Sequence, residues 1–407
     1  MAIRTPIYLD HHATTPLDSR VLEAMLPYFK DNFGNAASRN HSFGQVAEQA
    51  AEEARTQLAD ALGAYEKSEI VFTSGATESN NLAIKGVASI YRDKGNHIVT
   101  SAIEHKSVLD TCEHLEEMGF RVTYLPVNHE GLISLNDLRA AVTAKTILIS
   151  IMHANNEIGV LQPIEEIGKI AKERKIFFHC DAAQSIGKIP VDVQRMNIDL
   201  LSVSAHKIYG PKGIGVLYVR KQNPRVRLEP ILHGGGQENG LRSGTLNVPA
   251  IVGFAKAIQI AMEEMPKESK RLLLLRERLR SRIMENLSEV YVNGGLAHRL
   301  PENLNLSFAY VEGESLLMGL SNEIAVSSGS ACTHFSLEPS YVLKAIGVEA
   351  GLEHASVRFG LGRFNTEEEI DYAANAVTKV VNRLRELSPL YQNVRKNADL
   401  KFNEEFK

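Results

Sequence analysis

Short apolar segments alternate with helical segments along much of the chain, and this alternation limits the possible folds more than any other feature. Seven runs rich in apolar and β-branched residues predict strands: Glu69–Thr73, His97–Ser101, Arg121–Pro126, Thr146–His153, Ile176–Asp181, Leu200–Ser204 and Gly215–Val219. Helical patterns lie between several of them, at Glu78–Lys94, Lys106–Met118 and Ile164–Arg174. Buried strands joined by crossover helices predict a mostly parallel sheet that is covered on both faces.

A change in composition near residue 265 predicts a second, smaller domain. The chain has 407 residues, which is too long for one ordinary core. Met265-Pro266 interrupts a helical pattern, and a long charged helix is expected over Lys267–Leu287. Shorter strands and a final helix complete this part: Val290–Asn293, Asn303–Phe308 and Thr366–Leu387. We expect three parts, namely an N-terminal arm (1–15), a large α/β domain (16–264) and a smaller α+β domain (265–407).

Charge and cysteine content exclude several classes of protein. Lys plus Arg (45) against Asp plus Glu (49) gives a net charge of −4, so direct nucleic-acid binding is not expected. The three cysteines, Cys112, Cys180 and Cys332, are far apart, which excludes a disulfide framework and a C-x-x-C metal site. The N-terminal residues lack the pattern of a secretory signal, and apolar runs such as Ile147–Met152 are too short to span a bilayer. We expect a cytoplasmic protein without membrane contact.

A segment rich in Ser, Thr and Gly between a strand and a helix is a candidate anion site. Thr73-Ser-Gly-Ala-Thr-Glu-Ser-Asn80 places Gly75 and Thr77 where backbone amides at a helix N-terminus face an anion such as a phosphate. A capped turn between strand and helix explains the same residues without any ligand.

Two charged residues at strand ends suggest cofactor chemistry. Lys207 lies among small residues in Ser204-Ala-His-Lys207, and a buried lysine amine can act as a Schiff-base nucleophile. Asp181 ends another strand, where a carboxylate can pair with a protonated pyridine nitrogen. A helix cap for Asp181 and an ion pair for Lys207 are the structural alternatives.

Two further residues are candidates for proton and sulfur chemistry. His105 also follows a strand, although a single histidine is more often structural. Cys332 lies in Ser327-Ser-Gly-Ser-Ala-Cys332-Thr-His334, a Ser/Gly-rich stretch with little to bury a thiol, so we expect a mobile, reactive cysteine. The His11-His12 pair and His153 lack carboxylates or thiols at ligand spacing and are assigned no metal.

Taken together, these motifs resemble the cysteine desulfurases, which are fold-type-I enzymes that depend on pyridoxal phosphate. The resemblance covers essentially the whole chain and is greatest with the bacterial housekeeping branch that supplies iron–sulfur cluster assembly. The matching motifs are Tyr8–Pro16, Asn155–Gly159, His206–Gly213, Arg242–Thr245, Ser327–Cys332, Leu337–Val342 and Arg358–Arg363. The resemblance implies a large domain with a mostly parallel seven-stranded sheet that binds the cofactor, and a small domain with the cysteine segment (about 327–338).

The resemblance implies a catalytic role for three residues. Lys207 matches the lysine that binds pyridoxal phosphate, His105 matches a histidine that stacks on its ring and assists proton transfer, and Cys332 matches the cysteine that takes the substrate sulfur. Asp181 matches the partner of the pyridine nitrogen, and Gln184 matches a hydrogen-bond partner of the ring hydroxyl. L-cysteine would thus become alanine, with a persulfide left on the enzyme.

The phosphate group and the subunit arrangement follow from the same resemblance. Ala76, Thr77, Ser204 and His206 match residues of the phosphate site. Thr245 matches a threonine that completes this site from the neighbouring subunit, which implies a homodimer.

The resemblance also implies substrate contacts and partner proteins. Asn156 and Arg358 match residues that hold cofactor oxygen and the substrate carboxylate. An iron–sulfur scaffold protein and sulfur carriers are the implied acceptors, with Cys332 as a transient ligand of a cluster shared with the scaffold. The segment from Leu387 to Tyr391 resembles the part that docks the scaffold, whereas His334-Phe335 departs from the family pattern. We expect this departure to alter the pKa of the thiol or acceptor docking rather than the basic chemistry.

Three other functions remain open at this level. A selenocysteine lyase or sister-branch desulfurase would share the fold but is disfavoured by the Ser/Gly segment around Cys332. An aminotransferase would not need Cys332. A protein with a degenerate cofactor site would not be expected to retain Lys207, Asp181 and His105.

Overall fold

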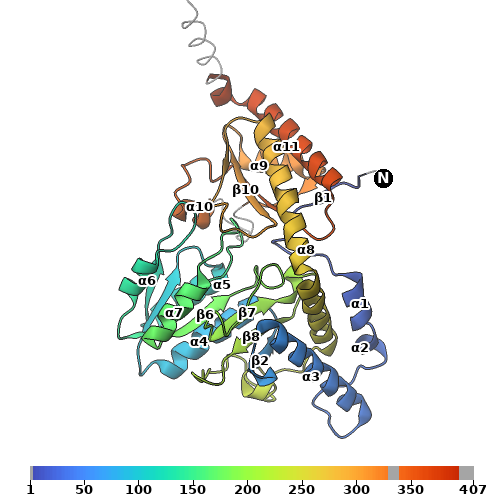
Figure 1. The fold of residues 1–407 in the computed structure, drawn as a ribbon, viewed down its shortest axis with the longest axis vertical. Helices are drawn as coiled ribbons and strands as arrows, with labels where there is room; N and C mark the ends of the chain where they lie inside the picture. The colour runs from blue at the N-terminus through green and yellow to red at the C-terminus, as the bar shows by residue number, and fades with distance from the viewer. Residues whose placement is uncertain (1–2, 329–338, 394–407) are drawn as a thin grey trace, which may run out of the picture. The chain divides into compact units, whose positions relative to one another are not determined.

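The computed structural model describes residues 3–328 and 339–393 (Figure 1), and these contain two compact units. The larger unit comprises residues 12–156 and 160–268. The smaller unit comprises the residues before His12, the short segment Glu157–Gly159 and the chain from Ser269 onward. Residues 157–159 thus belong to the smaller unit, whereas the residues directly before and after them belong to the larger one.

A seven-stranded sheet forms the centre of the larger unit, in the order β2-β8-β7-β6-β5-β3-β4. All seven strands match predicted segments, with end points that differ by a few residues at most. Their bounds are β2 Ile70–Thr73, β3 His97–Ser101, β4 Arg121–Leu125, β5 Thr146–Ser150, β6 Phe177–Asp181, β7 Leu200–Ser204 and β8 Gly215–Val219. Strand β8 is antiparallel to both β2 and β7. The remaining six strands all run in the same direction. The expected mostly parallel α/β fold is confirmed.

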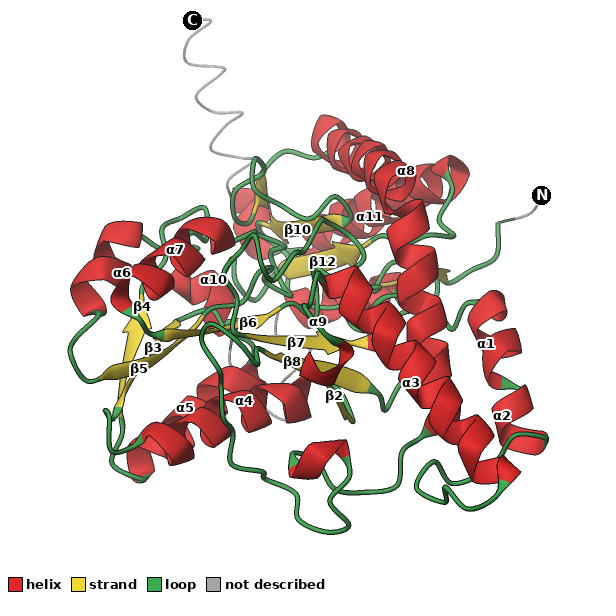
Figure 2. Ribbon diagram, turned by 60° about the horizontal axis from the view of Figure 1, so that its bottom comes forward, coloured by secondary structure: helices red, strands yellow, loops and turns green. Residues whose placement is uncertain are grey.

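Helices cover both faces of this sheet, as buried parallel strands require. Helices α4 and α5 lie on one face, and α6 and α7 lie on the other (Figure 2). Two apolar clusters fill the layers: Leu82, Val108 and Val219 belong to one, Ile167 and Phe178 to the other. The helices of this unit are α1 Ser19–Met25, α2 Pro27–Lys30, α3 Ser42–Leu62, α4 Ala76–Tyr91, α5 Lys106–Glu117, α6 Leu135–Ala141 and α7 Ile164–Arg174, with 3-10 turns η1 Lys67–Glu69, η2 Ala205–Lys207 and η3 Glu238–Gly240.

The smaller unit is α+β, with an antiparallel sheet in the order β12-β10-β9. A separate two-stranded sheet pairs β1 from the N-terminal segment with β11 in parallel. The apolar core of the smaller unit includes Leu306, Phe359 and Val377. The elements are β1 Ile7–Tyr8, β9 Val290–Val292, β10 Asn303–Phe308, α9 Gly313–Leu320, β11 Ile324–Ala325, α10 Tyr341–Ala345, β12 Ser356–Gly360 and α11 Glu367–Leu387.

Helix α8 corrects one detail of the sequence analysis. It runs from Val248 to Asn286 without a break, although an interruption was expected at Met265-Pro266. Proline removes one backbone N–H and crowds the carbonyl one turn earlier. In this long helix the neighbouring turns keep their own hydrogen bonds, so one lost bond does not end it. The division between the two units falls just after Glu268, within this helix.

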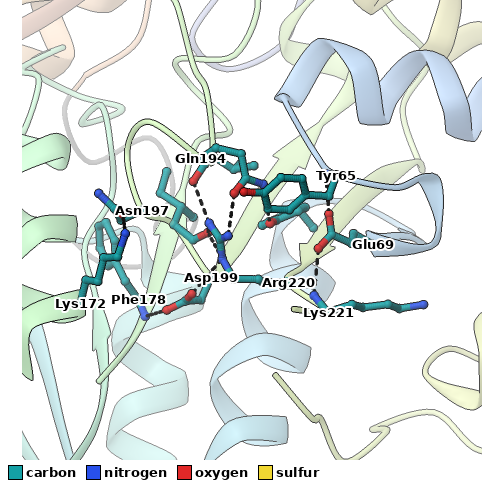
Figure 3. Close-up of polar contacts among 12 residues, drawn as sticks. Tyr65, Glu69, Lys172, Phe178, Gln194, Asn197, Asp199, Arg220 and Lys221 are labelled. Atoms are coloured by element: carbon teal, nitrogen blue, oxygen red, sulfur yellow. Dashed lines mark hydrogen bonds and ion pairs between the residues drawn. The ribbon is translucent and has the colours of Figure 1, made fainter. Parts of the chain in front are cut away.

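An ion pair fixes the edge of the large sheet where β6 and β7 begin (Figure 3). Arg220 Nε lies 3.0 Å from Asp199 Oδ1, and the guanidinium also donates to the carbonyl oxygens of Val193 and Ile198. Asp199 Oδ2 accepts a hydrogen bond from the backbone N–H of Phe178. These contacts tie three neighbouring strands together at the edge opposite the candidate site described below.

Within the described residues, no helix is both long and apolar enough to cross a membrane.

Candidate active site

The candidate residues of the larger unit gather where its parallel strands end. His105 follows β3, Asp181 ends β6, and Lys207 lies in the 3-10 turn directly after β7. All strands of the sheet except β8 have their carboxyl ends at this edge, which is where open α/β sheets bind ligands.

The amine of Lys207 is half-buried against the start of the larger unit. Its Nζ donates hydrogen bonds to the backbone carbonyl oxygens of His12 and Ala13, the latter at 2.8 Å. Thr15 holds the same segment in place, because its hydroxyl donates to the carbonyl oxygen of His206 at 3.0 Å. The lysine therefore lies beside a backbone segment that is fixed to its own turn.

Gln184 is buried and faces the same segment. Its Nε2 donates to the carbonyl oxygen of His12 at 2.9 Å, and its Oε1 lies 3.1 Å from Nδ1 of the His12 ring. Both ends of the amide thus contact His12 in this structure. The expected contact with a cofactor hydroxyl stays a prediction.

A chain of hydrogen bonds links Asp181 to His105. Asn80 Nδ2 donates to Asp181 Oδ2 at 2.7 Å and to Ser107 Oγ at 2.8 Å. Ser107 Oγ lies in turn 2.8 Å from His105 Nδ1. The backbone N–H of Ala183 supplies a further donor to Asp181, but a turn and not a helix follows, so the carboxylate is not a helix cap.

The sequence analysis assigned no role to Asn80 or Ser107. Both lie inside segments that it singled out, Thr73–Asn80 and Ile103–Ser107. The available signal was a polar residue at a buried helical position: Asn80 is fully buried in α4, and Ser107 is buried in the first turn of α5. Only the fold shows that these two helices meet Asp181.

Hydrogen bonding and burial define the protonation state of His105. Its Nδ1 accepts a hydrogen bond from the backbone N–H of Ser107, so the neutral ring carries its proton on Nε2. Burial lowers the pKa of His105, Asp181 opposes this effect, and the nearby Lys207 charge reinforces it. The ring is therefore uncharged at neutral pH, with its Nε2–H as a donor.

The N-terminus of α4 fits a phosphate group. Gly75 caps this helix without a side-chain hydrogen bond, so the first amides of a long helix face outward. Gly75 has φ of 152°, and a methyl group added there would meet only Ser204 Oγ within 4 Å, at 3.9 Å. Thr77 in the first turn is exposed, and Ser204 is buried at the end of β7.

His206 adds a neutral donor near the Lys207 turn. Burial and the charges of Lys207, Lys212 and Lys188 lower the pKa of His206 to about 4, so its ring is uncharged at neutral pH. Nδ1 lies 3.1 Å from Thr14 Oγ1. The amides at Ala76 and Thr77, the hydroxyl of Ser204 and this ring suit a phosphate, and Lys207 and Asp181 suit a pyridoxal ring.

The other expected site residues lie in further parts of the chain. Thr245 is exposed in the segment before α8, and Asn156 is buried after β5. Arg358 is buried in β12 of the smaller unit, where its Nη2 lies 2.9 Å from Asp10 Oδ1. Cys332 lies outside the described residues, as do His334 and Phe335.

The other two cysteines are buried thiols. Burial raises the pKa of Cys112 to about 12 and raises that of Cys180 well above its usual value, so both stay protonated. In the described part of the chain, no three His, Cys, Asp or Glu side chains are placed to hold a metal ion.

Comparison with known proteins identifies the family of this chain. The family model described as aminotransferase class-V matches residues 7–373. A cysteine desulfurase IscS of Anaeromyxobacter sp. (strain Fw109-5) is 58% identical over 98% of this chain and 98% of its own length. A solved NifS-like protein has a TM-score of 0.86 at 40% identity, covering 93% of this chain and 100% of that chain. A structure described as SspA in complex with cysteine has a TM-score of 0.77 at 43% identity, covering 88% and 100%.

The matched length and identity settle the family. The chain belongs to the class-V aminotransferases, and within them to the cysteine desulfurases. Enzymes of this family depend on pyridoxal phosphate, which the residues around Lys207 and the N-terminus of α4 are suited to hold. The fold-type-I architecture expected from the sequence is confirmed.

Proposed function

We propose that this protein is a pyridoxal-phosphate-dependent cysteine desulfurase that converts L-cysteine to L-alanine and takes the sulfur onto Cys332. The observation that carries the proposal is the convergence of Lys207, Asp181 and His105 at one edge of the sheet, beside an uncapped helix N-terminus. Family membership adds the substrate, because the relatives are named cysteine desulfurases.

The residues around Lys207 have different proposed roles in cofactor binding and proton transfer. Pyridoxal phosphate, when bound, supplies an electron sink for the substrate carbanion. Asn80 fixes the orientation of the Asp181 carboxylate, which would pair with the ring nitrogen of the bound cofactor. Lys207 would hold the cofactor and move the α-proton, and the neutral His105 ring would assist this proton transfer.

Cys332 then takes the sulfur. Its thiolate attacks the sulfur of the substrate, so an S–S bond forms while the bond between that sulfur and the β-carbon breaks. The electron pair of the broken bond passes to the substrate carbon skeleton, which is protonated to give alanine. Arg358 and Asn156 are proposed to hold the substrate carboxylate and cofactor oxygen.

The protein is proposed to act as a homodimer and to deliver sulfur to other proteins. Thr245, which is exposed, would complete the phosphate site of the neighbouring subunit. An iron–sulfur scaffold protein and sulfur carriers are the proposed acceptors, in the cytoplasm, with Cys332 as a transient ligand of a cluster shared with the scaffold. The Leu387–Tyr391 segment is the proposed docking part for the scaffold.

A Cys332→Ala variant tests the central step. We expect a yellow holoenzyme whose absorption still changes when L-cysteine is added but which releases almost no alanine. The matched control is Cys112→Ala, which removes a buried thiol from α5 and should leave alanine release intact. Normal alanine release by Cys332→Ala would overturn the proposal, because the C–S bond would then break without this thiol. Parallel assays with L-selenocysteine separate a desulfurase from a selenocysteine lyase.

A further inference from the structure

The described residues on either side of Cys332 are each anchored within the smaller unit. On the N-terminal side, Ser327 forms a bridge to strand β12, where the backbone N–H of Arg358 donates to the Ser327 carbonyl oxygen at 2.7 Å. On the C-terminal side, Ser340 caps helix α10 by accepting the N–H of Leu343 at 3.2 Å. The Ser340 hydroxyl also donates to Glu157 Oε2.

Glu157 reaches this position from a distant part of the sequence and is held rigidly. Its backbone carbonyl accepts hydrogen bonds from the side-chain amides of Asn303 and Asn305 in β10, both at 3.2 Å. Two residues further on, Gly159 has φ of 68°, and a methyl group there would lie 2.4 Å from the Asn303 side chain. The N–H of Leu300 donates to the Gly159 carbonyl at 2.9 Å, so the segment is fixed at both ends.

Burying the carboxyl group of Glu157 at this place costs free energy of folding, which suggests that the group has a function. Glu157 is 2% exposed, and burial raises its pKa to about 7, against the opposing effects of the Ser340 hydroxyl and the Arg358 charge. Packing alone would favour an apolar side chain of similar size. This carboxyl group accepts a hydrogen bond from the hydroxyl of Ser340, which follows the segment that contains Cys332.

We propose that Glu157 is a positioning residue for sulfur transfer, because its bond to Ser340 fixes the point at which the Cys332 segment rejoins the fold. The inference rests on the proposed function of Cys332 as sulfur acceptor. Glu157 directly follows Asn156, an expected cofactor-site residue, so one short stretch of sequence serves both the cofactor pocket and the anchor of the thiol segment.

The test compares two substitutions of Glu157 in the holoenzyme. Glu157→Leu removes the acceptor, whereas Glu157→Gln keeps an oxygen that Ser340 can still reach. Persulfide on Cys332 is measured by mass spectrometry after rapid mixing with saturating L-cysteine. We expect at least a roughly tenfold slower persulfide formation in Glu157→Leu and near-normal formation in Glu157→Gln. The absorption change on L-cysteine binding, and the concentration that half-saturates it, should stay unchanged in both.

A second readout does not depend on turnover. The rate at which iodoacetamide alkylates Cys332 without substrate should differ between Glu157→Leu and the wild type. The matched control is Glu312→Leu, which removes another glutamate that bonds a helix N-terminus of the same unit, α9. Glu312 is exposed and accepts hydrogen bonds from the N–H groups of Glu314 and Ser315 in α9, so persulfide formation should be unaffected.

Each other outcome counts against the inference. If Glu157→Leu does not fold, Ser340→Ala keeps Glu157 and removes the same bond, and it must show the same selective loss. Normal persulfide formation in these variants overturns the positioning role, as does an equal slowing of the absorption change and persulfide formation. Failure of the proposed function is recognised separately, because Cys332→Ala would then release alanine normally.

Discussion

At the scale of single residues, the candidate site depends on polar side chains that orient others. Asn80 is the central example, because one amide group binds both the Asp181 carboxylate and the Ser107 hydroxyl that contacts His105. Hydrogen bonds to buried charged groups contribute more than ordinary ones. We therefore expect the two functions, cofactor binding and proton transfer, to be coupled through Asn80.

Replacing Asn80 should weaken both functions at once. Asn80→Ala removes the bond to a buried carboxylate, and we expect a loss of about 1.5–3 kcal/mol in the free energy of unfolding. Pyridoxal phosphate should also dissociate more readily, as measured by absorption titration. The control is the next residue: Asn81→Ala changes a half-buried side chain whose Nδ2 donates to the Thr77 carbonyl oxygen, not to a carboxylate. Equal effects from both variants would contradict the prediction.

Replacing His105 should affect the reaction more than cofactor binding. His105→Gln removes a ring whose pKa is lowered by burial, and with it a proton acceptor at neutral pH. We expect kcat to fall by roughly 10²–10⁴-fold, with the absorption band of the bound cofactor retained. His114→Gln, on the exposed side of the same helix, serves as the control. A kcat within a factor of about two of the wild type would show that the ring takes no part in proton transfer.

At the scale of elements, a buried histidine joins three parallel strands. His179 in β6 lies 2.8 Å from Ser150 Oγ in β5 through Nδ1 and 2.9 Å from Ser202 Oγ in β7 through Nε2. The side chain is fully buried, and burial lowers its pKa to about 4. The ring is therefore neutral in the folded protein, while in the unfolded chain it titrates near its ordinary pKa of about 6.5.

This difference predicts a loss of stability in acid. Between pH 6.5 and pH 4 the unfolded chain binds a proton at His179 that the folded protein does not, so stability is full above pH 6.5 and falls as the pH is lowered toward 4. The upper bound for one such group is about 3 kcal/mol. Urea unfolding at pH 7.5 and pH 5 should show a smaller pH dependence for His179→Gln than for the wild type. An identical pH dependence in both proteins would exclude this role.

The strands show how much of the fold the sequence predicts. All seven strands of the large sheet were expected, because each is a short apolar run bounded by polar residues. The predicted interruption at Pro266 was wrong, because helix propensity of a single residue does not include the many other hydrogen bonds of α8. The placement of Glu157–Gly159 with the smaller unit could not be foreseen, since it depends on the close approach of Gly159 to Asn303.

The site was predicted less completely than the fold, for a related reason. Lys207, Asp181 and His105 were found because each is a charged or titratable residue at a strand end. Asn80 and Ser107 were passed over because they are ordinary polar residues within helices, whose partners lie in other elements. Roles that the resemblance supplied for Thr245, Arg358 and the other matched positions remain predictions.

At the scale of the whole molecule, the proposed dimer has a direct genetic test. If Thr245 serves the neighbouring subunit, a Lys207→Ala subunit still donates its Thr245 to a Thr245→Ala partner whose own Lys207 is intact. Mixed dimers of these two subunits then contain one complete site. We expect alanine release near half of the wild-type rate per mixed dimer, although each homodimer of a single variant is strongly impaired.

Two controls define this complementation experiment. Mixed dimers of Lys207→Ala and wild-type subunits give the activity of a single intact site. Mixed dimers of Lys207→Ala with a Lys207→Ala, Thr245→Ala double variant contain no catalytic lysine and should be inactive. If the two single variants fail to complement each other while the first control is active, Thr245 acts within its own subunit.

The pairing of β1 with β11 affects how the chain folds during synthesis. Ile7 and Tyr8 are translated before the larger unit, but their partners Ile324 and Ala325 are translated more than three hundred residues later. The larger unit, in contrast, is complete once Glu268 has emerged. The first strand must therefore wait with unpaired backbone groups while the rest of the chain is made, and such long-range pairing is slow. For this protein, the N-terminal strand is among the last parts to reach its final place.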